Sequence, residues 1–324
     1  MTTKNRPIFI EILPVLLLLF LAVFLSFWKG SATAVKDGIN LWILCVVPSL
    51  FPYLFITAIC SNLNATKKLG NLFSPITRKL FNVNGIGGYL FFISTFSGYP
   101  SGAKAVADAK KEGLLSDAES VRASAFCSIA SPAFLISSIG GITFNSPRFG
   151  LLLFSSNLVV SFLIGIIFSF YKRDEKPSSK TANNFTPSQN LLFDSALNSV
   201  TSLLIVGALI TVFYLLCEIL IALKILTPFI KLLTFITKDE ELSLSIISGS
   251  LEVTGGLKRL STFSPKLALP IASALTGFGG VSVIMQSVTF LKSAKIKTAP
   301  FFLSKISSAV LNFLLSLILS IIFL

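Results

Sequence analysis

Long apolar runs separated by short polar interruptions dominate the pattern along this chain. A run of about 20 apolar residues crosses the roughly 30 Å hydrocarbon layer of a bilayer as a helix. Five uninterrupted runs approach that length, and the pattern therefore predicts membrane-spanning helices at Ile8 to Trp28, Ile39 to Cys60, Phe149 to Tyr171, Leu203 to Leu223 and Phe301 to Leu324. The first run is too long and lacks the cleavage site of a signal peptide, so we expect a retained helix.

Two further runs are long enough to span but contain helix-breaking residues. Ala123 to Ile142 is interrupted by "ASP", and Leu267 to Phe290 is interrupted by "TGFGG". Irregular backbone at membrane depth must face protein or a water-filled cavity, because lipid offers no hydrogen-bond partners. The pattern predicts two broken helices.

A polar stretch divides the chain into two similar halves. The segment 172–190, "KRDEKPSSKTANNFTPSQN", has the composition of a linker. Before it, "SGYPSGAKAV" precedes "SIASPAFLISSIGG"; after it, "SGSLEVTGGLKRL" precedes "LTGFGGVSVIMQ". The Gly-x-Lys triplets that begin at Gly102 and Gly256 lie about 154 residues apart. Similar motifs in the same order indicate an internal repeat, which is common in secondary transporters. The expected organisation is an N-terminal transmembrane helix (1–33), a first repeat (34–171), a cytoplasmic linker (172–190) and a second repeat (191–324).

Two short apolar arms predict re-entrant helical hairpins, one in each half. The arm Gly85 to Phe96 is too short to span comfortably, so we expect hairpins at Phe81 to Lys110 and at Leu242 to Arg259. With the N-terminus inside, about 17 of the 27 basic residues fall on the inner side. This places the hairpins at opposite faces. The expected fold is an all-α polytopic membrane protein with about seven transmembrane helices, two re-entrant hairpins and two broken helices in an inverted repeat.

Composition argues against nucleic-acid binding, metal binding and catalysis. The formal charge of +13 is explained by basic inner loops, so no nucleic-acid partner is expected. The chain has no histidine, and its four cysteines lie in apolar segments without CxxC spacing. We expect buried thiols, no metal site, no catalytic residue and no enzymatic activity.

The first hairpin tip carries backbone groups suited to an anion. Gly98, Pro100 and Gly102 allow a tight turn, and helix N-termini there favour negative charge. Lys104 either contacts such a ligand or pairs with Asp108 one turn on. The alternative is a plain surface loop. The candidate solute-binding residues of this tip are Gly98, Tyr99, Pro100, Ser101, Gly102 and Lys104, with Tyr99 placed to stack on a planar ring.

The second tip places a carboxylate inside a membrane segment, which is costly and by default functional. Glu252 either pairs with Lys258 across a site, carries a proton, or holds a sodium ion; an exposed surface pair is the alternative. The candidate residues of this tip are Glu252, Thr254, Gly255 and Lys258.

The two broken helices supply freed carbonyls and polar side chains. Gln286 either hydrogen-bonds a polar solute or joins helices to each other. The candidates in these helices are Ser131, Pro132, Gly277, Gly279, Gly280, Ser282 and Gln286.

Several motifs resemble one family. "GYPSGAKAVADAKKEGLLSDAES", "SPAFLISSIGG", "FNSPRFG", "LEVTGGLKRLS" and "GFGGVSVIMQ" resemble, in order, the bacterial sporulation integral membrane proteins with a nucleoside-recognition, or gate, domain. The characterised member of that family is the stage V dipicolinate transporter. The resemblance extends from about Ala34 onward. The first motif is fairly specific and the others are loose.

The resemblance implies a fold similar to the concentrative nucleoside transporters, with the two repeats as gate domains. It also implies dipicolinate transport from mother cell toward forespore, in the mother-cell-derived membrane around the forespore. Two departures make the site less polar: Ile129 and Ala130 replace polar family residues, and no histidine lies near Ile284. The identity of the substrate, dipicolinate or another solute, therefore stays open.

The expected function is transport of a small anionic or nucleoside-like solute across the cell membrane. No cofactor is expected, although a coupling sodium ion or proton is compatible with Glu252. The alternative is a non-transporting membrane scaffold required for spore maturation. Besides the solute and the lipid bilayer, a homo-oligomer or a sporulation membrane partner stays open.

Overall fold

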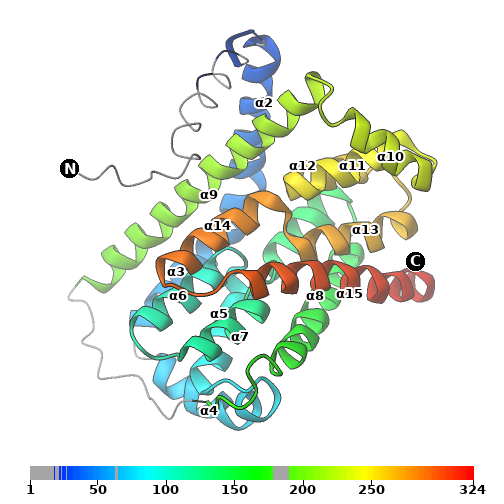
Figure 1. The fold of residues 1–324 in the computed structure, drawn as a ribbon. Helices are drawn as coiled ribbons and strands as arrows, with labels where there is room; N and C mark the ends of the chain where they lie inside the picture. Colours follow the sequence, from blue (N-terminus) through cyan, green and yellow to red (C-terminus); the bar gives the residue numbers. More distant parts are fainter. Residues whose placement is uncertain (1–17, 19–21, 23, 27, 63–64, 178–189) are drawn as a thin grey trace, which may run out of the picture.

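The computed structural model describes residues 18, 22, 24–26, 28–62, 65–177 and 190–324. Most of the first predicted span and most of the linker lie outside the described residues. Every element in the described part is a helix, so the predicted all-helical class is confirmed there (Figure 1).

The helices of the first half follow the predicted order. They are α2 (Trp28–Leu41), the π-helix η1 (Trp42–Val46), α3 (Val47–Asn62), α4 (Ala65–Leu80), α5 (Gly85–Ser97), α6 (Ser101–Lys111), α7 (Asp117–Phe126), the π-helix η2 (Ala133–Thr143) and α8 (Pro147–Phe168). The predicted hairpin corresponds to α5 and α6, which pack against each other. The first broken helix corresponds to α7 and η2.

The second half contains the same kinds of element. They are α9 (Leu191–Ala222), α10 (Thr227–Thr237), α11 (Glu240–Leu251), α12 (Val253–Leu260), α13 (Pro265–Phe278), α14 (Gly280–Ser293) and α15 (Ala299–Phe323). Here α11 and α12 pack as the hairpin pair, and α13 and α14 form the second broken helix.

Four helical segments of the described chain are long and apolar enough to cross a membrane. They are α8, α9, the combined segment Pro265–Ser293 and α15. Predicted spans at 149–171, 203–223, 267–290 and 301–324 overlap these four. The predicted span at 123–142 is two short helices separated by residues 127–132, because Pro132 lacks the N–H that a continuous helix needs. The number of spans and their orientation stay predictions.

Side-chain caps fix where the short helices begin. Asn84 accepts a hydrogen bond from the Ile86 amide at the start of α5. Ser116 and Glu119 form a reciprocal capping box at the start of α7. Each cap satisfies amides that the first turn of a helix leaves unpaired. Residues next to each helix start therefore determine where the short helices begin.

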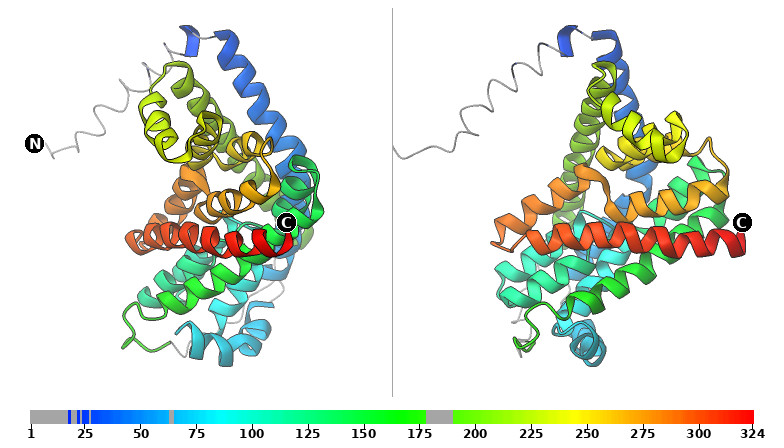
Figure 2. Two further views of the ribbon diagram at one scale, coloured as in Figure 1. Left: turned by 90° about the vertical axis from the view of Figure 1, so that its right-hand side faces the viewer. Right: turned by 45° about the vertical axis from the view of Figure 1, so that its right-hand side comes forward.

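The two halves share their apolar cores. One buried cluster combines α5, α6, α7 and α8 with α14, and another combines η2 and α8 with α12 and α13. Figure 2 shows α15 running across the molecule, where it packs on α13 of its own half and on α8 of the first half. Because each cluster draws on both halves, the helix breaks of the two halves are brought to one region.

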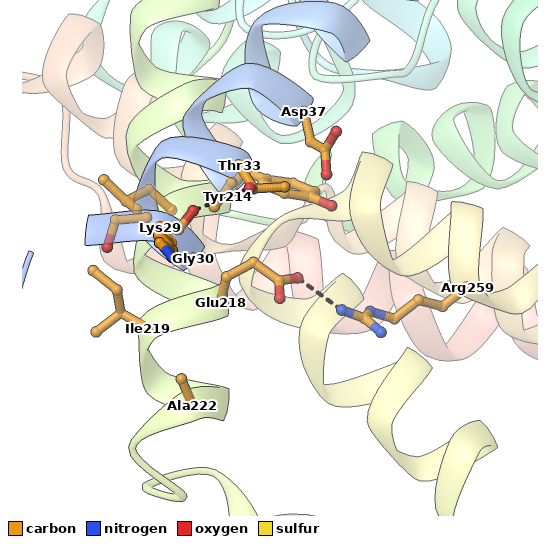
Figure 3. A pocket seen from close by; sticks show the side chains of 12 residues that line it. Lys29, Gly30, Thr33, Asp37, Tyr214, Glu218, Ile219, Ala222 and Arg259 are labelled. Atoms are coloured by element: carbon orange, nitrogen blue, oxygen red, sulfur yellow. Dashed lines mark hydrogen bonds and ion pairs between the residues drawn. The ribbon is translucent and has the colours of Figure 1, made fainter. Parts of the chain in front are cut away.

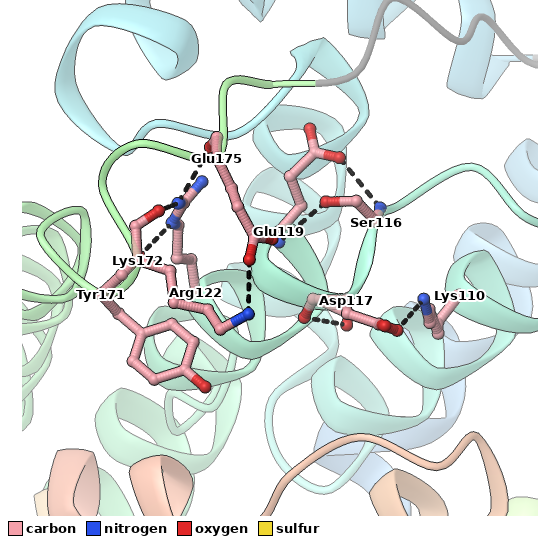
Figure 4. A network of polar contacts seen from close by, with 9 residues as sticks. Lys110, Ser116, Asp117, Glu119, Arg122, Tyr171, Lys172 and Glu175 are labelled. Carbon is pink, nitrogen blue, oxygen red and sulfur yellow. Dashed lines mark hydrogen bonds and ion pairs between the residues drawn. The ribbon is translucent and has the colours of Figure 1, made fainter.

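A buried arginine ties the end of α8 to α7 and the start of α5. Arg122 donates hydrogen bonds to the carbonyl oxygens of Asn82, Tyr171, Lys172 and Glu175 (Figure 4). A buried charge is tolerated when it is well hydrogen-bonded, and four carbonyl oxygens supply the pairing here.

An ion pair on the opposite side of this network joins α6 to α7. Lys110 pairs with Asp117, and this hydrogen bond lowers the pKa of the Asp117 carboxyl (Figure 4). The Asp117 side chain is largely exposed, so solvent limits what the pair adds to stability.

Candidate functional site

The tip of the first hairpin lies against the first broken helix. Gly98 has a φ of +72°, in the region that favours glycine, and a Cβ atom added to it would lie 2.9 Å from the Ser131 nitrogen. The Tyr99–Pro100 peptide bond is cis. One turn on, a Cβ atom on Gly102 would overlap the carbonyl oxygen of Cys127. Both glycines therefore permit close backbone approach.

The tip of the second hairpin lies against the second broken helix in the same way. Gly280 has a φ of +72°, and an added Cβ atom would lie 3.2 Å from the Val253 nitrogen and 3.3 Å from the Leu251 carbonyl oxygen. An added Cβ atom on Gly279 would lie 3.8 Å from the ring of Tyr99, which belongs to the first tip. All four helix breaks therefore meet in one place.

A pocket lies where the breaks meet. It has about 440 Å³ of empty space, part of it continuous with the outside, and a water-sized sphere can be centred in only about 40 Å³ of it. The predicted site residues that line it are Gly98, Tyr99, Pro100, Ser131, Glu252, Thr254 and Gln286. Apolar side chains of η1, α3 and α9 complete the wall. The pocket is thus built from both halves, and only a small part of it is wide enough for a water molecule.

Glu252 occupies the position between α11 and α12 and is 2% exposed. Its carboxylate accepts hydrogen bonds from the amides of Thr254 at 3.0 Å and Gly255 at 2.7 Å. It is therefore the N-cap of α12 as well as a wall of the pocket. The amides at the start of α12 therefore bind the protein's own carboxylate.

Two buried polar atoms in the pocket wall have no hydrogen-bond partner among the residues that the structure describes. They are the Tyr99 hydroxyl and the Gln286 Oε1 atom. The Gln286 amide nitrogen donates to the Ser282 hydroxyl at 3.2 Å, which holds the side chain in place. Buried polar groups in proteins are nearly always paired, so a donor and an acceptor here are available to a polar solute.

The lysines of the repeated triplet do not line the pocket. Lys104 lies half-buried on α6, and Asp108 has Lys111 as its ion-pair partner at 4.0 Å. Lys258 is exposed on α12, whereas Glu252 is buried, so these two predicted partners are not brought together. The structure places neither lysine where a solute in this pocket would contact it.

The remaining predicted residues lie on the elements around the pocket but do not line it. Ser101 begins α6, and Pro132 precedes η2. Gly255 lies against the ring of Tyr214, with an added Cβ atom 2.8 Å from it. Gly277 lies against Asn312 of α15, with an added Cβ atom 2.5 Å from Nδ2.

Lys305 of α15 is a residue that the sequence reasoning missed. It is 1% exposed, donates to the Ser128 carbonyl oxygen of the first break, and lies 5.4 Å from the centre of the Tyr99 ring. A single lysine within the apolar run "FFLSKISSAV" is the pattern that could have found it, because an ionisable residue inside a span is a functional candidate.

A buried polar cluster joining three long helices was also missed. Ser156 of α8 and Ser273 of α13 both donate to Asn312 Oδ1 of α15, at 3.0 and 3.2 Å. Asn157 donates to the Thr276 hydroxyl at 3.1 Å. These side chains lie scattered in apolar runs, and only the packing shows that they pair with one another.

A larger pocket opens between α2, α9 and α12, with about 1050 Å³ of empty space that includes open solvent (Figure 3). Its wall contains Lys29, Asp37 and Tyr214, together with an ion pair of Glu218 and Arg259 at 2.7 Å. The Tyr214 ring, which packs on Gly255, lies between this pocket and the second hairpin tip.

A search of curated proteins matches one protein over most of the chain. The chain is 28% identical over 315 residues to the sporulation integral membrane protein YlbJ of Bacillus subtilis (strain 168), which covers 89% of this chain and 77% of the relative. The predicted resemblance to sporulation integral membrane proteins is thereby confirmed. No family model and no solved structure matches the chain.

Proposed function

We propose that the chain transports a small planar polar solute across the membrane during spore formation, with dipicolinate as the first solute to test and a nucleoside as the second. The observation that carries the proposal is the pocket where the four helix breaks meet, lined by Tyr99, Glu252 and Gln286 from both halves. Broken helices meeting between two halves are typical of solute sites in secondary transporters.

On this proposal, the solute crosses the membrane by alternating access. The pocket lies between the two halves, and side chains from both halves line it. Rocking of one half against the other would open it to one side and then to the other. On this proposal the hairpins are re-entrant, the halves form an inverted repeat, and the fold is like that of the concentrative nucleoside transporters.

The charge of the pocket affects which solute can enter it. Glu252 is the ionisable carboxyl in the wall, and among the described residues the lining contains no lysine or arginine. Entry of a dianion such as dipicolinate therefore needs a coupling proton or sodium ion that neutralises Glu252. A nucleoside needs no such neutralisation and can pair with Tyr99 and Gln286 directly. On this proposal the chain is a multi-pass membrane protein that performs no catalysis.

Uptake into vesicles reconstituted with the purified protein tests the proposal. We expect wild type to accumulate dipicolinate or a nucleoside, with the rate responding to a pH or sodium gradient. Glu252→Gln, which keeps an oxygen for the α12 cap, should lose that response and most of the uptake. Lys258→Gln, a change at an exposed residue on the same helix, is the matched control and should transport normally.

The scaffold hypothesis makes the opposite prediction. Folded wild-type protein that moves neither solute under any gradient would overturn the transport proposal and favour a partner-binding role in the membrane.

A further inference from the structure

Lys305 presents a buried positive charge with an incomplete set of partners. An ammonium group carries three donors, and the Ser128 carbonyl oxygen takes one of them. In the described part of the chain, no aspartate or glutamate lies within ion-pair distance of it. An uncompensated charge inside a membrane span is strongly unfavourable. A lysine in this position either binds a negative group beside it or gives up its proton.

A small polar cavity lies at this lysine. It has about 260 Å³ of empty space but only about 10 Å³ in which a water-sized sphere can be centred, which is room for about one such particle. Its polar lining consists of Ser128, Asn157, Ser161, Lys305 and Ser308, and no acidic side chain lines it among the described residues.

Some of the lining donors are already committed. The Asn157 amide donates to the Leu153 carbonyl oxygen and to Thr276, and the Ser161 hydroxyl donates to the Phe126 carbonyl oxygen. The Ser128 hydroxyl, in contrast, is buried and has no partner within the described residues. The donors that remain for an occupant are the Lys305 ammonium, the Ser128 hydroxyl and the hydroxyl of Ser308, which accepts a hydrogen bond from Asn312.

We propose that this cavity binds a single-atom anion of the chloride class between Lys305 and Ser128. An anion satisfies both donors and balances the buried charge, whereas a water molecule would leave the charge uncompensated. The room for about one particle excludes a carboxylate-bearing solute. This site is separate from the solute pocket, because the two share no lining residue.

The bound anion joins the two halves. Lys305 belongs to α15 of the second half, and Ser128 belongs to the first helix break. Occupancy would hold α15 against that break and so stabilise the folded protein by linkage.

Thermal unfolding of purified protein at one ionic strength, in sodium chloride or sodium gluconate, tests the proposal. We expect chloride to raise the Tm of wild type by about 3 °C over gluconate. Lys305→Met should lose this chloride shift and be no less stable in gluconate, because it removes the uncompensated charge. Ser128→Ala should reduce the shift, and Lys258→Met, at an exposed lysine, should keep it. Chloride-35 NMR of wild type should show line broadening that bromide removes by competition.

Equal Tm values of wild type in the two salts, together with no chloride line broadening, would overturn the proposal. A chloride shift that survives in Lys305→Met, or a stabilisation by acetate or dipicolinate but not by chloride, would also overturn it. If Lys305→Met does not fold, the Ser128→Ala shift and the wild-type NMR competition decide the question. Because none of these readouts uses transport, the anion site can fail while solute uptake holds.

Discussion

The two hairpin tips look alike in sequence but present different chemistry to the pocket. The first tip offers a backbone turn at Gly98 and the Tyr99 ring, with no charged side chain in the wall. The second tip offers the carboxylate of Glu252, which also caps α12. The feature that the two share is close backbone packing: an added Cβ atom would overlap Cys127 at Gly102, and Gly249 at Gly256. The repeated Gly-x-Lys triplet thus marks two sites of close backbone packing, and its lysines do not line the pocket.

The largest expected effect tests this shared packing. Gly102→Val and Gly256→Val should each destabilise the protein by about 3 kcal/mol or more, because the added side chain meets backbone that cannot move aside. Gly30→Ala is the control, since no atom in the described part of the chain lies within 4 Å of the position of its added Cβ atom. Thermal unfolding in detergent measures all three. A wild-type Tm in either valine variant contradicts the packing role of the triplet.

The next effect tests the difference between the tips. Glu252→Gln should reduce solute uptake about 10-fold to 100-fold with little loss of stability, because one acceptor for the cap remains. Glu252→Ala should also destabilise by about 1 kcal/mol through loss of the cap. Uptake rate and Tm, measured on the same preparations, separate the two roles. If uptake falls only in proportion to the lost stability, Glu252 serves only as the N-cap of α12.

A smaller effect is expected at the first tip. Tyr99→Phe should weaken apparent solute affinity about 5-fold, the equivalent of one hydrogen bond, while stability stays equal or rises, because a buried unpaired hydroxyl is removed. The concentration dependence of uptake measures this effect. An unchanged affinity indicates that the hydroxyl does not contact the solute.

The smallest effect concerns the lysines. Lys104→Ala and Lys258→Ala should each change uptake less than about 2-fold, because neither side chain lines the pocket. A large loss for Lys104→Ala alone would show that the first tip rearranges to bring this lysine to the solute, and would restore the anion-binding interpretation of that tip.

The course of the helices could be predicted further than the roles of the side chains. Glycine, proline and run length mark the breaks at Gly98, Pro132 and Gly279, since these residues act locally on the backbone. Which face of a helix turns inward depends on packing between distant segments. For that reason the sequence suggested Lys104 and Lys258 as ligands, gave no indication that Glu252 would cap α12, and hid Lys305 within an apolar span.

The most direct test of the central claim asks whether one solute occupies both tips at once. Ser131→Cys, in the first helix break, and Thr254→Cys, in the second hairpin, both line the pocket and can be made separately in a protein whose native cysteines are replaced by alanine. Labelling by a small thiol reagent is then measured with and without dipicolinate or a nucleoside. The account predicts that one solute protects both cysteines with the same half-maximal concentration. Protection at one cysteine only, or at neither, would contradict a shared site.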